Sequence, residues 1–374
     1  MSDPRIKPIT MPKWGLSMKE GKLAGWLVQA GAKLKAGDEI MEIETDKIAN
    51  VVQAAEDGTL RRVVGEKDAM YPVKALLGVV ADDSVSDTDI DAFVAGYVAP
   101  VAGGDDDEGA SAYAFAQLPE GRIRYAKRGE GTNTVIFIHG FGGDADNWLF
   151  NIDAPAKAAS VYALDLPGHG ESVKTLADPS LAGLAKTVAV FMDALKIDSA
   201  HFVGHSLGGA IAMRLALDAP KRVKSLTLIG SAGLGSEING DYLDGFVSAA
   251  SRRDLKPVVE QLFANQELVS RQLIDNLLRA KRIDGVEATL RSLAGSVFPG
   301  GKQGANLAGE IVKSGKPVQV IWGREDQIIP ASHAAAFGGA AKSEVIDGAG
   351  HMVQMEAAAK VNSLIEAMVG AAHS

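Results

Sequence analysis

The chain has 374 residues, of which 47% are hydrophobic, so two or three domains with cores of their own are expected. It contains no cysteine, which excludes disulfides, thiolate zinc sites and cysteine nucleophiles and fits a reducing cytoplasm. The net charge of −9 lies in one segment, because residues 81–111 hold nine acidic and no basic side chains whereas residues 1–80 are net +1. Without a basic patch, an apolar run of about 18 residues or an N-terminal signal sequence, we expect no nucleic-acid binding, no membrane span and no secretion.

Residues 5–80 contain short apolar runs separated by glycines, which predicts a small all-β sandwich. Within this part, residues 38–50 alternate between apolar and polar positions on both sides of a polar tip at 44–49. Such alternation indicates a β-hairpin that presents Lys47 to solvent. From the pattern alone, Lys47 would be interpreted as an ordinary solvated charge, as a lysine in a polar turn usually is, and only its context indicates a function.

Several short motifs give residues 1–80 a more specific character. These are residues 9–15 (ITMPKWG), 20–21 (EG), 37–38 (GD), 44–47 (ETDK) and Gly58. In them the segment resembles a lipoyl domain of the 2-oxo acid dehydrogenase type. The resemblance implies that Lys47 carries lipoate through an amide bond. Biotin carriers place their lysine between two methionines, whereas Asp46 and Ile48 flank Lys47, which favours lipoate over biotin.

Residues 81–111 are rich in Asp, Ser, Ala and Gly and have few large apolar side chains after Tyr97. Low hydrophobicity with charge of one sign predicts an acidic flexible linker that does not pack. Such a chain spans roughly 30 Å, which gives a tethered group an effective concentration on the order of millimolar. The alternative is an acidic segment that only increases solubility.

Residues 112–374 alternate near-continuous apolar runs with segments long enough for crossover helices, which predicts an α/β fold around a mostly parallel sheet. Residues 234–312 interrupt this rhythm with helical patterns and no strong strand run, and we expect them to form a cap over the sheet. The predicted strands are residues 134–138, 161–164, 201–203, 225–229, 318–322 and 343–346.

The sharpest chemical motif is GHSLGG at residues 204–209, which fits G-x-S-x-G between a strand run and a helical stretch. Small residues on both sides let the chain turn sharply and expose the hydroxyl of Ser206. The pentapeptide alone is a weak signal, because Gly and Ser are common in turns. Its strand–turn–helix context predicts that Ser206 is a nucleophile.

A serine nucleophile needs a base and an acid that orients the base. His351 lies in a glycine-rich loop after the last predicted strand, and Asp326 follows the strand that ends at Trp322. We expect His351 to accept the serine proton and Asp326 to hold the imidazole, with Glu325 as the rival acid. The other histidines lie in glycine-rich turns, in a strand, beside the nucleophile, at a helix start or in the terminal tail: His139, His169, His201, His205, His333 and His373.

The order Ser206, Asp326, His351 is that of α/β-hydrolases, which residues 112–369 resemble in five separated motifs. In this fold the loop after the first long strand supplies one oxyanion donor, so we expect the backbone amides of Phe141 and Leu207 to form the oxyanion hole. The turn at residues 165–172 (DLPGHGES) also resembles one common in these hydrolases, and we interpret it as structural. No metal is expected in this site.

A lipoyl domain joined to an α/β-hydrolase resembles the dihydrolipoamide acetyltransferase components of bacterial acetoin-cleaving (acetoin dehydrogenase) systems. The resemblance implies partners: thiamin diphosphate-dependent acetoin dehydrogenase subunits that load acetyl onto the lipoyl group, and dihydrolipoamide dehydrogenase. It also implies coenzyme A as the acetyl acceptor. The chain departs from ordinary lipoyl acyltransferases, because no histidine is followed four residues later by Asp and no separate subunit-binding domain fits before residue 112.

The leading hypothesis is therefore a cytoplasmic, lipoyl-bearing acyltransferase subunit that delivers acetyl from Lys47 to coenzyme A, with Ser206 as the attacking group. A second hypothesis is a lipoyl-tethered serine hydrolase or thioesterase that acts independently of acetyl-CoA formation. A third is a carrier whose hydrolase-like half is a scaffold without activity.

Overall fold

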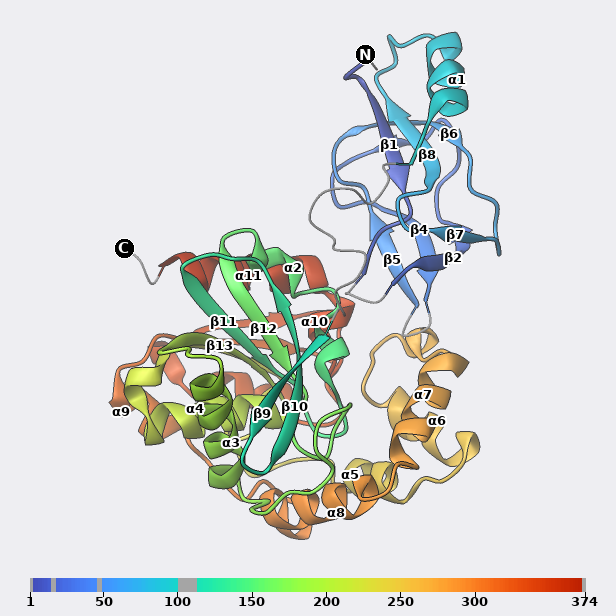
Figure 1. Cartoon of the computed structure of the whole chain (residues 1–374). Coiled ribbons are helices and arrows are strands. Elements are labelled where there is room, and N and C mark those ends of the chain that lie inside the picture. Colours follow the sequence, from blue (N-terminus) through green and yellow to red (C-terminus); the bar gives the residue numbers. More distant parts are fainter. Residues whose placement is uncertain (1–2, 15–17, 46–48, 100–112, 372–374) are drawn as a thin grey trace. The chain divides into compact units, whose positions relative to one another are not determined.

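The computed structural model describes residues 3–14, 18–45, 49–99 and 113–371. The chain divides into two compact units, Met1–Ser111 and Ala112–Ser374 (Figure 1). Each unit has its own sheets and its own buried side chains, and the two are described separately below.

The N-terminal unit contains two four-stranded sheets, with strand orders β1-β8-β6-β3 and β5-β4-β2-β7. All of its strand pairs are antiparallel, and the predicted small all-β sandwich is confirmed. The strands are β1 (Ile6–Thr10), β2 (Glu20–Trp26), β3 (Lys33–Leu34), β4 (Glu39–Glu44), β5 (Ala49–Gln53), β6 (Gly58–Val63), β7 (Met70–Pro72) and β8 (Leu76–Ala81).

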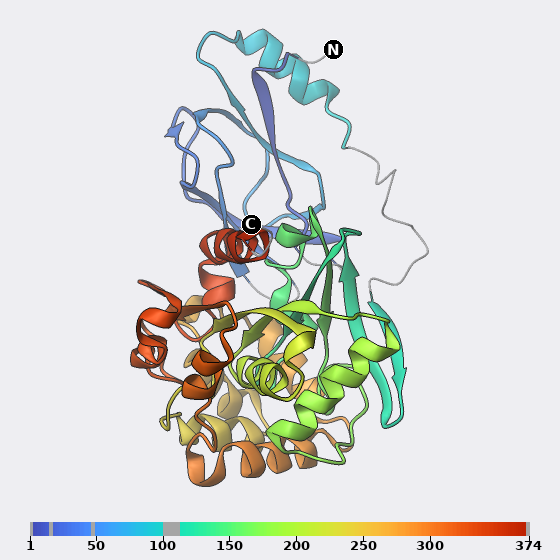
Figure 2. The ribbon, with the colours of Figure 1, turned by 90° about the vertical axis from the view of Figure 1, so that its left-hand side faces the viewer.

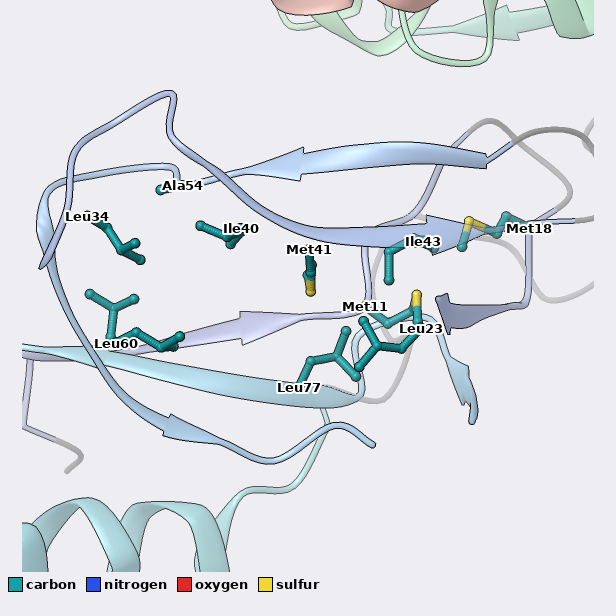
Figure 3. Close-up of a cluster of buried hydrophobic side chains, with 11 residues drawn as sticks. Met11, Met18, Leu23, Leu34, Ile40, Met41, Ile43, Ala54, Leu60 and Leu77 are labelled. Atoms are coloured by element: carbon teal, nitrogen blue, oxygen red, sulfur yellow. The ribbon is translucent and has the colours of Figure 1, made fainter. Parts of the chain in front are cut away.

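Strands β4 and β5 form the predicted hairpin, whose last described pair is Glu44 with Ala49. Alternation sends Met41 and Ile43 into the core between the sheets, where both are fully buried (Figure 3). The hairpin is therefore anchored by its apolar face, as its sequence pattern requires. Lys47 and its neighbours Asp46 and Ile48 lie outside the described residues.

The predicted linker needs a correction. We expected residues 81–111 not to pack, but helix α1 (Asp87–Gly96) begins within them and is capped by Ser86, whose side chain accepts from the Asp89 amide. Ile90 is fully buried in a small second core together with Ile6, Val79, Ala81 and Val85. The acidic side chains that suggested disorder pair with arginines of β6: Asp87 with Arg61 and Arg62, and Asp91 with Arg62.

The C-terminal unit is built on one eight-stranded sheet of order β16-β15-β14-β13-β11-β12-β10-β9. The six predicted strands are present and pair in parallel, which confirms the α/β class. A hairpin that the sequence did not suggest, β9–β10, adds an antiparallel edge. The strands are β9 (Tyr113–Leu118), β10 (Gly121–Arg128), β11 (Asn133–Ile138), β12 (Ala159–Leu164), β13 (Ala200–His205), β14 (Val223–Ile229), β15 (Val318–Gly323) and β16 (Lys342–Ile346).

Helices cover both faces of this sheet, as its buried strands require. One face is covered by α3 (Leu181–Ala194) and α4 (Leu207–Asp218), which pack on each other, and the other by α2 (Asp153–Ala156) and α11 (Ala358–Ala371). Figure 2 shows the same layers from the side. A short helix, α10 (Val353–Glu356), precedes α11 and packs near β15. No described helix is long and apolar enough to cross a membrane.

The cap between β14 and β15 consists of α5 (Gly240–Ser248), α6 (Arg252–Glu260), α7 (Arg271–Lys281) and α8 (Val286–Val297). These helices lie together along one end of the C-terminal unit (Figure 1). The last helix of the predicted 234–312 insertion, α9 (Ala308–Ser314), instead packs against α4. The cap is therefore slightly shorter than expected, because α9 belongs to the layer that covers the sheet.

Candidate active site

Ser206 lies at the turn between β13 and α4, with φ 51° and ψ −120°. A left-handed φ is costly for a residue other than glycine and persists only where the surroundings impose it. Here they do: the Ser206 N–H donates to Ile229 O at 2.9 Å, and its carbonyl accepts from the amides of Gly209 and Ala232, both at 3.0 Å. The backbone of Ser206 is thus fixed on both sides.

The first glycine and the fifth residue of the GHSLGG motif have to be glycine, because a Cβ at either position would clash with backbone atoms. A Cβ on Gly204 would lie 2.5 Å from Gly208 O, and a Cβ on Gly208 would lie 2.1 Å from Ile138 O. Both clashes are with backbone, which has no room to yield. The motif therefore packs the start of α4 directly against the end of β11.

His351 and Asp326 meet after the ends of β16 and β15. The His351 Nδ1 lies 2.8 Å from Asp326 Oδ2, and both side chains are almost completely buried. The other carboxylate oxygen, Oδ1, accepts from the amides of Ile328 at 2.8 Å and Ile329 at 2.9 Å. These donors orient the carboxylate, so Asp326 in turn fixes the orientation of the ring and favours the tautomer that carries its hydrogen on Nδ1.

Ser206 and His351 are connected through the end of β14. Gly230 directly follows Ile229, which holds the Ser206 amide, and has φ +48°. A Cβ placed on Gly230 would lie 3.3 Å from His351 Nδ1 and 3.5 Å from Asp326 Oδ2. The ends of parallel strands meet at one edge of a sheet, and this brings the three predicted residues to the same place although 145 positions separate the first from the last.

The loop after β11 lies beside the serine. A Cβ on Gly140 would be 2.9 Å from the Cβ of Ser206, so Phe141 follows at close range. Leu207 is the first residue of α4, where a backbone N–H has no acceptor within the helix. Both amides expected to bind an oxyanion are therefore in the neighbourhood of Ser206.

Two buried histidines support this loop. His139 Nδ1–H donates to Gly140 O at 2.8 Å, while its Nε2 accepts from the Leu166 amide at 3.0 Å. His169 Nε2 accepts from the Gly142 amide at 3.1 Å. Burial lowers the pKa of His139 to about 4 and that of His169 to about 3, so both rings are neutral. Both rings therefore hold the loop. Among the described residues, neither forms a hydrogen bond with His351 or Asp326.

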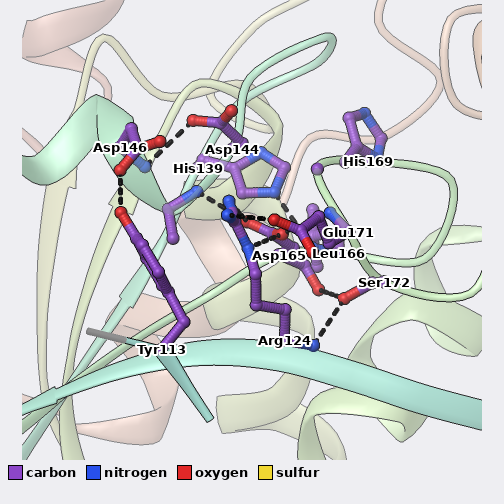
Figure 4. A network of polar contacts seen from close by, with 12 residues as sticks. Tyr113, Arg124, His139, Asp144, Asp146, Asp165, Leu166, His169, Glu171 and Ser172 are labelled. Atoms are coloured by element: carbon purple, nitrogen blue, oxygen red, sulfur yellow. Dashed lines mark hydrogen bonds and ion pairs between the residues drawn. The ribbon is translucent and has the colours of Figure 1, made fainter. Parts of the chain in front are cut away.

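Figure 4 shows the turn at residues 165–172, which we interpreted as structural. Asp165 is fully buried and pairs with Arg124, with Nε at 2.5 Å and Nη2 at 3.1 Å from its two oxygens. The same carboxylate accepts from the amides of Ala145 and Glu171, both at 2.8 Å. The buried ion pair thus joins Arg124 of β10 to Asp165 at the end of β12. Through the amide of Ala145 it also holds the segment that follows the loop after β11.

Aromatic side chains of the cap cover the loop after β11, in which Phe141 lies. The rings of Phe246 and Phe298 lie 6.1 Å and 6.4 Å from that of Phe141, both edge to face. A Cβ on Gly142 would lie 2.4 Å from the ring of Phe246. The cap therefore packs aromatic rings against the loop that follows β11.

The remaining candidates have other positions. Glu325, the rival acid, accepts from the Ala349 amide at 3.1 Å and does not pair with His351. His205 is buried, and burial lowers its pKa well below the usual value; its Nε2–H donates to His351 O at 3.0 Å. His333 pairs with Glu237 at 2.8 Å. His373 lies outside the described residues.

Sequence reasoning overlooked Glu356. Its carboxylate accepts three backbone amides around the loop that carries His351. The only signal was an acidic residue in the otherwise apolar stretch that follows His351. Within the described ranges, no group of three or more His, Asp or Glu side chains is arranged to hold a metal ion.

Comparisons with known proteins agree with this architecture. Residues 7–80 match the family model described as biotin-requiring enzyme, and residues 133–358 match that of the alpha/beta hydrolase fold. The dihydrolipoyllysine-residue acetyltransferase component of the acetoin cleaving system from Cupriavidus necator is 53% identical over 98% of both chains. Its counterpart from Pseudomonas putida is 47% identical over 96% of this chain and 97% of that one. The chain belongs to this family of acetyltransferase components.

Membership confirms the resemblance seen in the sequence, with a lipoyl domain and an α/β-hydrolase domain in one acyltransferase. Among solved structures, a meta-cleavage product hydrolase from Pseudomonas fluorescens IP01 superimposes with a TM-score of 0.63 and 26% identity. That match covers 69% of this chain and 98% of the hydrolase. The acetyltransferase therefore has a hydrolase fold for its larger unit.

Proposed function

We propose that this acetyltransferase transfers an acetyl group from a thioester on its own lipoyl arm to coenzyme A, with Ser206 as the nucleophile. The observation that carries the proposal is the buried bond of 2.8 Å between His351 and Asp326, in the same site as a serine held at a strained turn. The two relatives from Cupriavidus necator and Pseudomonas putida are named as dihydrolipoyllysine-residue acetyltransferase components of an acetoin cleaving system, which supports an acetyl transfer that involves a lipoyl-lysine.

In the first half of the reaction, His351 Nε2 accepts the hydroxyl proton as Ser206 Oγ attacks the carbonyl carbon of the acetyl thioester. Charge develops on the carbonyl oxygen, where the amides of Phe141 and Leu207 donate hydrogen bonds. Asp326 stabilises the imidazolium and does not take its proton. The C–S bond then breaks, the imidazolium returns the proton to the leaving sulfur, and an acetyl ester of Ser206 remains.

In the second half, His351 removes the proton from the thiol of coenzyme A, whose sulfur attacks the acetyl ester. The same two amides bind the second oxyanion. As the C–O bond breaks, Ser206 Oγ recovers a proton from His351, and acetyl-CoA leaves. A serine ester divides one transfer between two bulky thiols into two steps, so both thiols use the same small site in turn.

Lipoate is assigned to Lys47, which follows the rigid hairpin strand β4 by three residues. The fully buried Met41 and Ile43 anchor that strand, so the hairpin suits the presentation of a lysine at its end. When attached, the lipoyl group supplies a thiol that carries acyl groups as a thioester. Loss of the corresponding mass adduct in a Lys47→Arg variant of the natively produced protein is the expected outcome of intact-mass spectrometry.

Partners and location follow from the same assignment. The chain is a component of an acetoin-cleaving system, with thiamin diphosphate-dependent acetoin dehydrogenase subunits loading the arm and dihydrolipoamide dehydrogenase reoxidising it. The absence of cysteine in all 374 residues suits the reducing cytoplasm, where such a system operates.

The test is the Ser206→Ala variant in the complete system. Acetyl-CoA formation should fall by at least about three orders of magnitude, while acetyl still accumulates on the lipoyl arm. Asp326→Asn should lower the rate nearly as strongly, because His351 loses the partner that fixes its tautomer. Acetyl-CoA formation at an undiminished rate by Ser206→Ala would overturn the serine mechanism.

A second candidate is hydrolysis of the acyl thioester by water, independent of coenzyme A. The fold neighbour from Pseudomonas fluorescens IP01 is a hydrolase by name, and it favours this alternative. The two candidates differ in product. Acetate released at the same rate with and without coenzyme A indicates hydrolysis, whereas acetyl-CoA in proportion to thioester consumed indicates transfer.

A further inference from the structure

The loop that carries His351 is attached to the cap on both sides of the histidine. After His351, the Met352 amide donates to Leu262 O at 3.0 Å. Before it, Gly350 lies so close to the cap that a Cβ there would be 2.7 Å from Ala264 N and 2.9 Å from Leu262 O. The cap segment that makes these contacts, residues 262–265, begins two residues after the end of α6.

Glu356 fastens the same two segments together. Its Oε1 accepts from the amides of Ala264 at 2.9 Å and Asn265 at 3.0 Å, and its Oε2 accepts from the Gly350 amide at 2.7 Å. One carboxylate therefore satisfies three backbone donors from segments that lie 85 or more positions apart in the chain. Hydrogen bonds to a charged acceptor are roughly twice as strong as those between neutral groups.

The opposite side of His351 is held by the nucleophile's strand. His205, the residue before Ser206, donates from Nε2–H to His351 O at 3.0 Å. Asp326 holds the ring itself at 2.8 Å. The position of the imidazole is thus set from two directions. The sheet acts through His205 and Asp326, and the cap acts through Leu262 and through the two amides that donate to Glu356.

From these contacts we infer that Glu356 is a positioning residue that couples the cap to the base of the reaction. The carboxylate holds His351 in position beside Ser206 only while residues 262–265 of the cap donate their hydrogen bonds to it. A cap that shifts as a thioester enters or leaves therefore moves the base as well. This inference rests on the proposed roles of Ser206 and His351 and adds to them a link to the cap.

The link is tested by the rate at which a fluorophosphonate labels Ser206 in the full-length protein. Labelling forms a bond from Ser206 Oγ to phosphorus and releases fluoride, while His351 takes the serine proton, so it reports the base without any acyl substrate. In Glu356→Gln an amide NH₂ replaces one acceptor and faces a backbone N–H. We expect the labelling rate at saturating probe to fall about 10- to 100-fold, with the half-saturating concentration within about two-fold of wild type.

Glu325→Gln is the matched control. Glu325 also accepts a backbone amide of the His351 loop, that of Ala349 at 3.1 Å. Within the part of the chain that the structure describes, it forms no hydrogen bond or ion pair with the cap. Its variant should label within about three-fold of wild type. Equal rates in Glu356→Gln and wild type, or equal losses in both variants, would overturn the coupling.

A pair of cap variants tests the link without altering Glu356. Asn265 has φ −90°, in the negative range on the extended side of proline's own value, and a proline there removes one of the three donors. Asn265→Pro should label several-fold more slowly than Asn265→Ala, and equal rates contradict the inference. If Ser206→Ala abolishes labelling but leaves acetyl-CoA formation intact, the proposed function fails while the labelling rates still decide the role of Glu356.

Discussion

Two neutral histidines, His139 and His169, hold the loop after β11, and they predict that the hydrolase unit loses stability in mild acid. Burial holds the folded-state pKa of His139 at about 4 and that of His169 at about 3, below the usual value of 6.5. In the unfolded chain both rings bind a proton near pH 6.5. The stability that they contribute is therefore complete above pH 6.5 and is lost as the pH falls toward the folded-state pKa values.

The magnitude follows from proton linkage. Each ring that is protonated only in the unfolded state costs about 1.4 kcal/mol per pH unit, so between pH 6.5 and pH 5 each contributes a loss of about 2 kcal/mol. In His169→Gln, the new Oε1 is placed to accept from the Gly142 amide as Nε2 does, but it does not titrate. The variant should therefore lose about 2 kcal/mol less than wild type over this interval.

The assay is urea unfolding followed by circular dichroism of the helices, at pH 7 and at about pH 5, with the free energy of unfolding extrapolated to water. The decisive quantity is the difference between the two pH values in each protein, which cancels any loss that the substitution itself causes. An equal pH dependence in His169→Gln and wild type would refute the reasoning, because it would mean that His169 does not remain neutral in the fold.

Three further substitutions test the packing described above. Gly208→Ala places a Cβ 2.1 Å from Ile138 O and should destabilise the hydrolase unit by about 1–3 kcal/mol, measured by urea unfolding. Asp165→Asn removes the buried counter-charge of Arg124, which keeps only the exposed Glu171 at 3.2 Å, and should cost about 3–5 kcal/mol in the same assay. Ile90→Ala opens a cavity under α1 and should cost the lipoyl unit about 2–5 kcal/mol, seen as faster amide exchange in β8.

Each has a matched control on the same chain. Gly295→Ala, in a helix with nothing within 4 Å of the added Cβ, should stabilise by about 0.5–1 kcal/mol. Asp153→Asn breaks a half-exposed pair and should cost less than about 1 kcal/mol. Val98→Ala alters a side chain that is 79% exposed and should change little. If a control variant changes the free energy of unfolding as much as its test variant does, the contact tested by that pair does not stabilise the fold as described.

The sequence predicted those features whose causes are local. Apolar runs predicted the parallel strands, and the spacing of Gly204 and Gly208 around Ser206 marked the turn. The contact that requires Gly208 is not local, because a Cβ there would meet Ile138 O at the end of β11. Helix α1 was not predicted, because its acidic side chains were interpreted as those of a solvated linker. Their partners, Arg61 and Arg62, lie on strand β6, distant in the sequence. Glu356 escaped because its function depends on amides that only the fold brings near it.

The return of α1 onto its own domain shortens the stretch of chain between the two folded units. Tyr97, at the end of this helix, donates its hydroxyl to Lys74 O at 3.1 Å, which pins the departure of the chain. From Tyr97 to the first strand of the hydrolase at Tyr113, a fully extended chain covers at most roughly 55 Å, about half of what 31 unfolded residues would reach. Melting of α1 would about double this maximum length. In the transfer proposed above, the effective concentration of the lipoyl-bound acetyl group around Ser206 would then fall about three-fold.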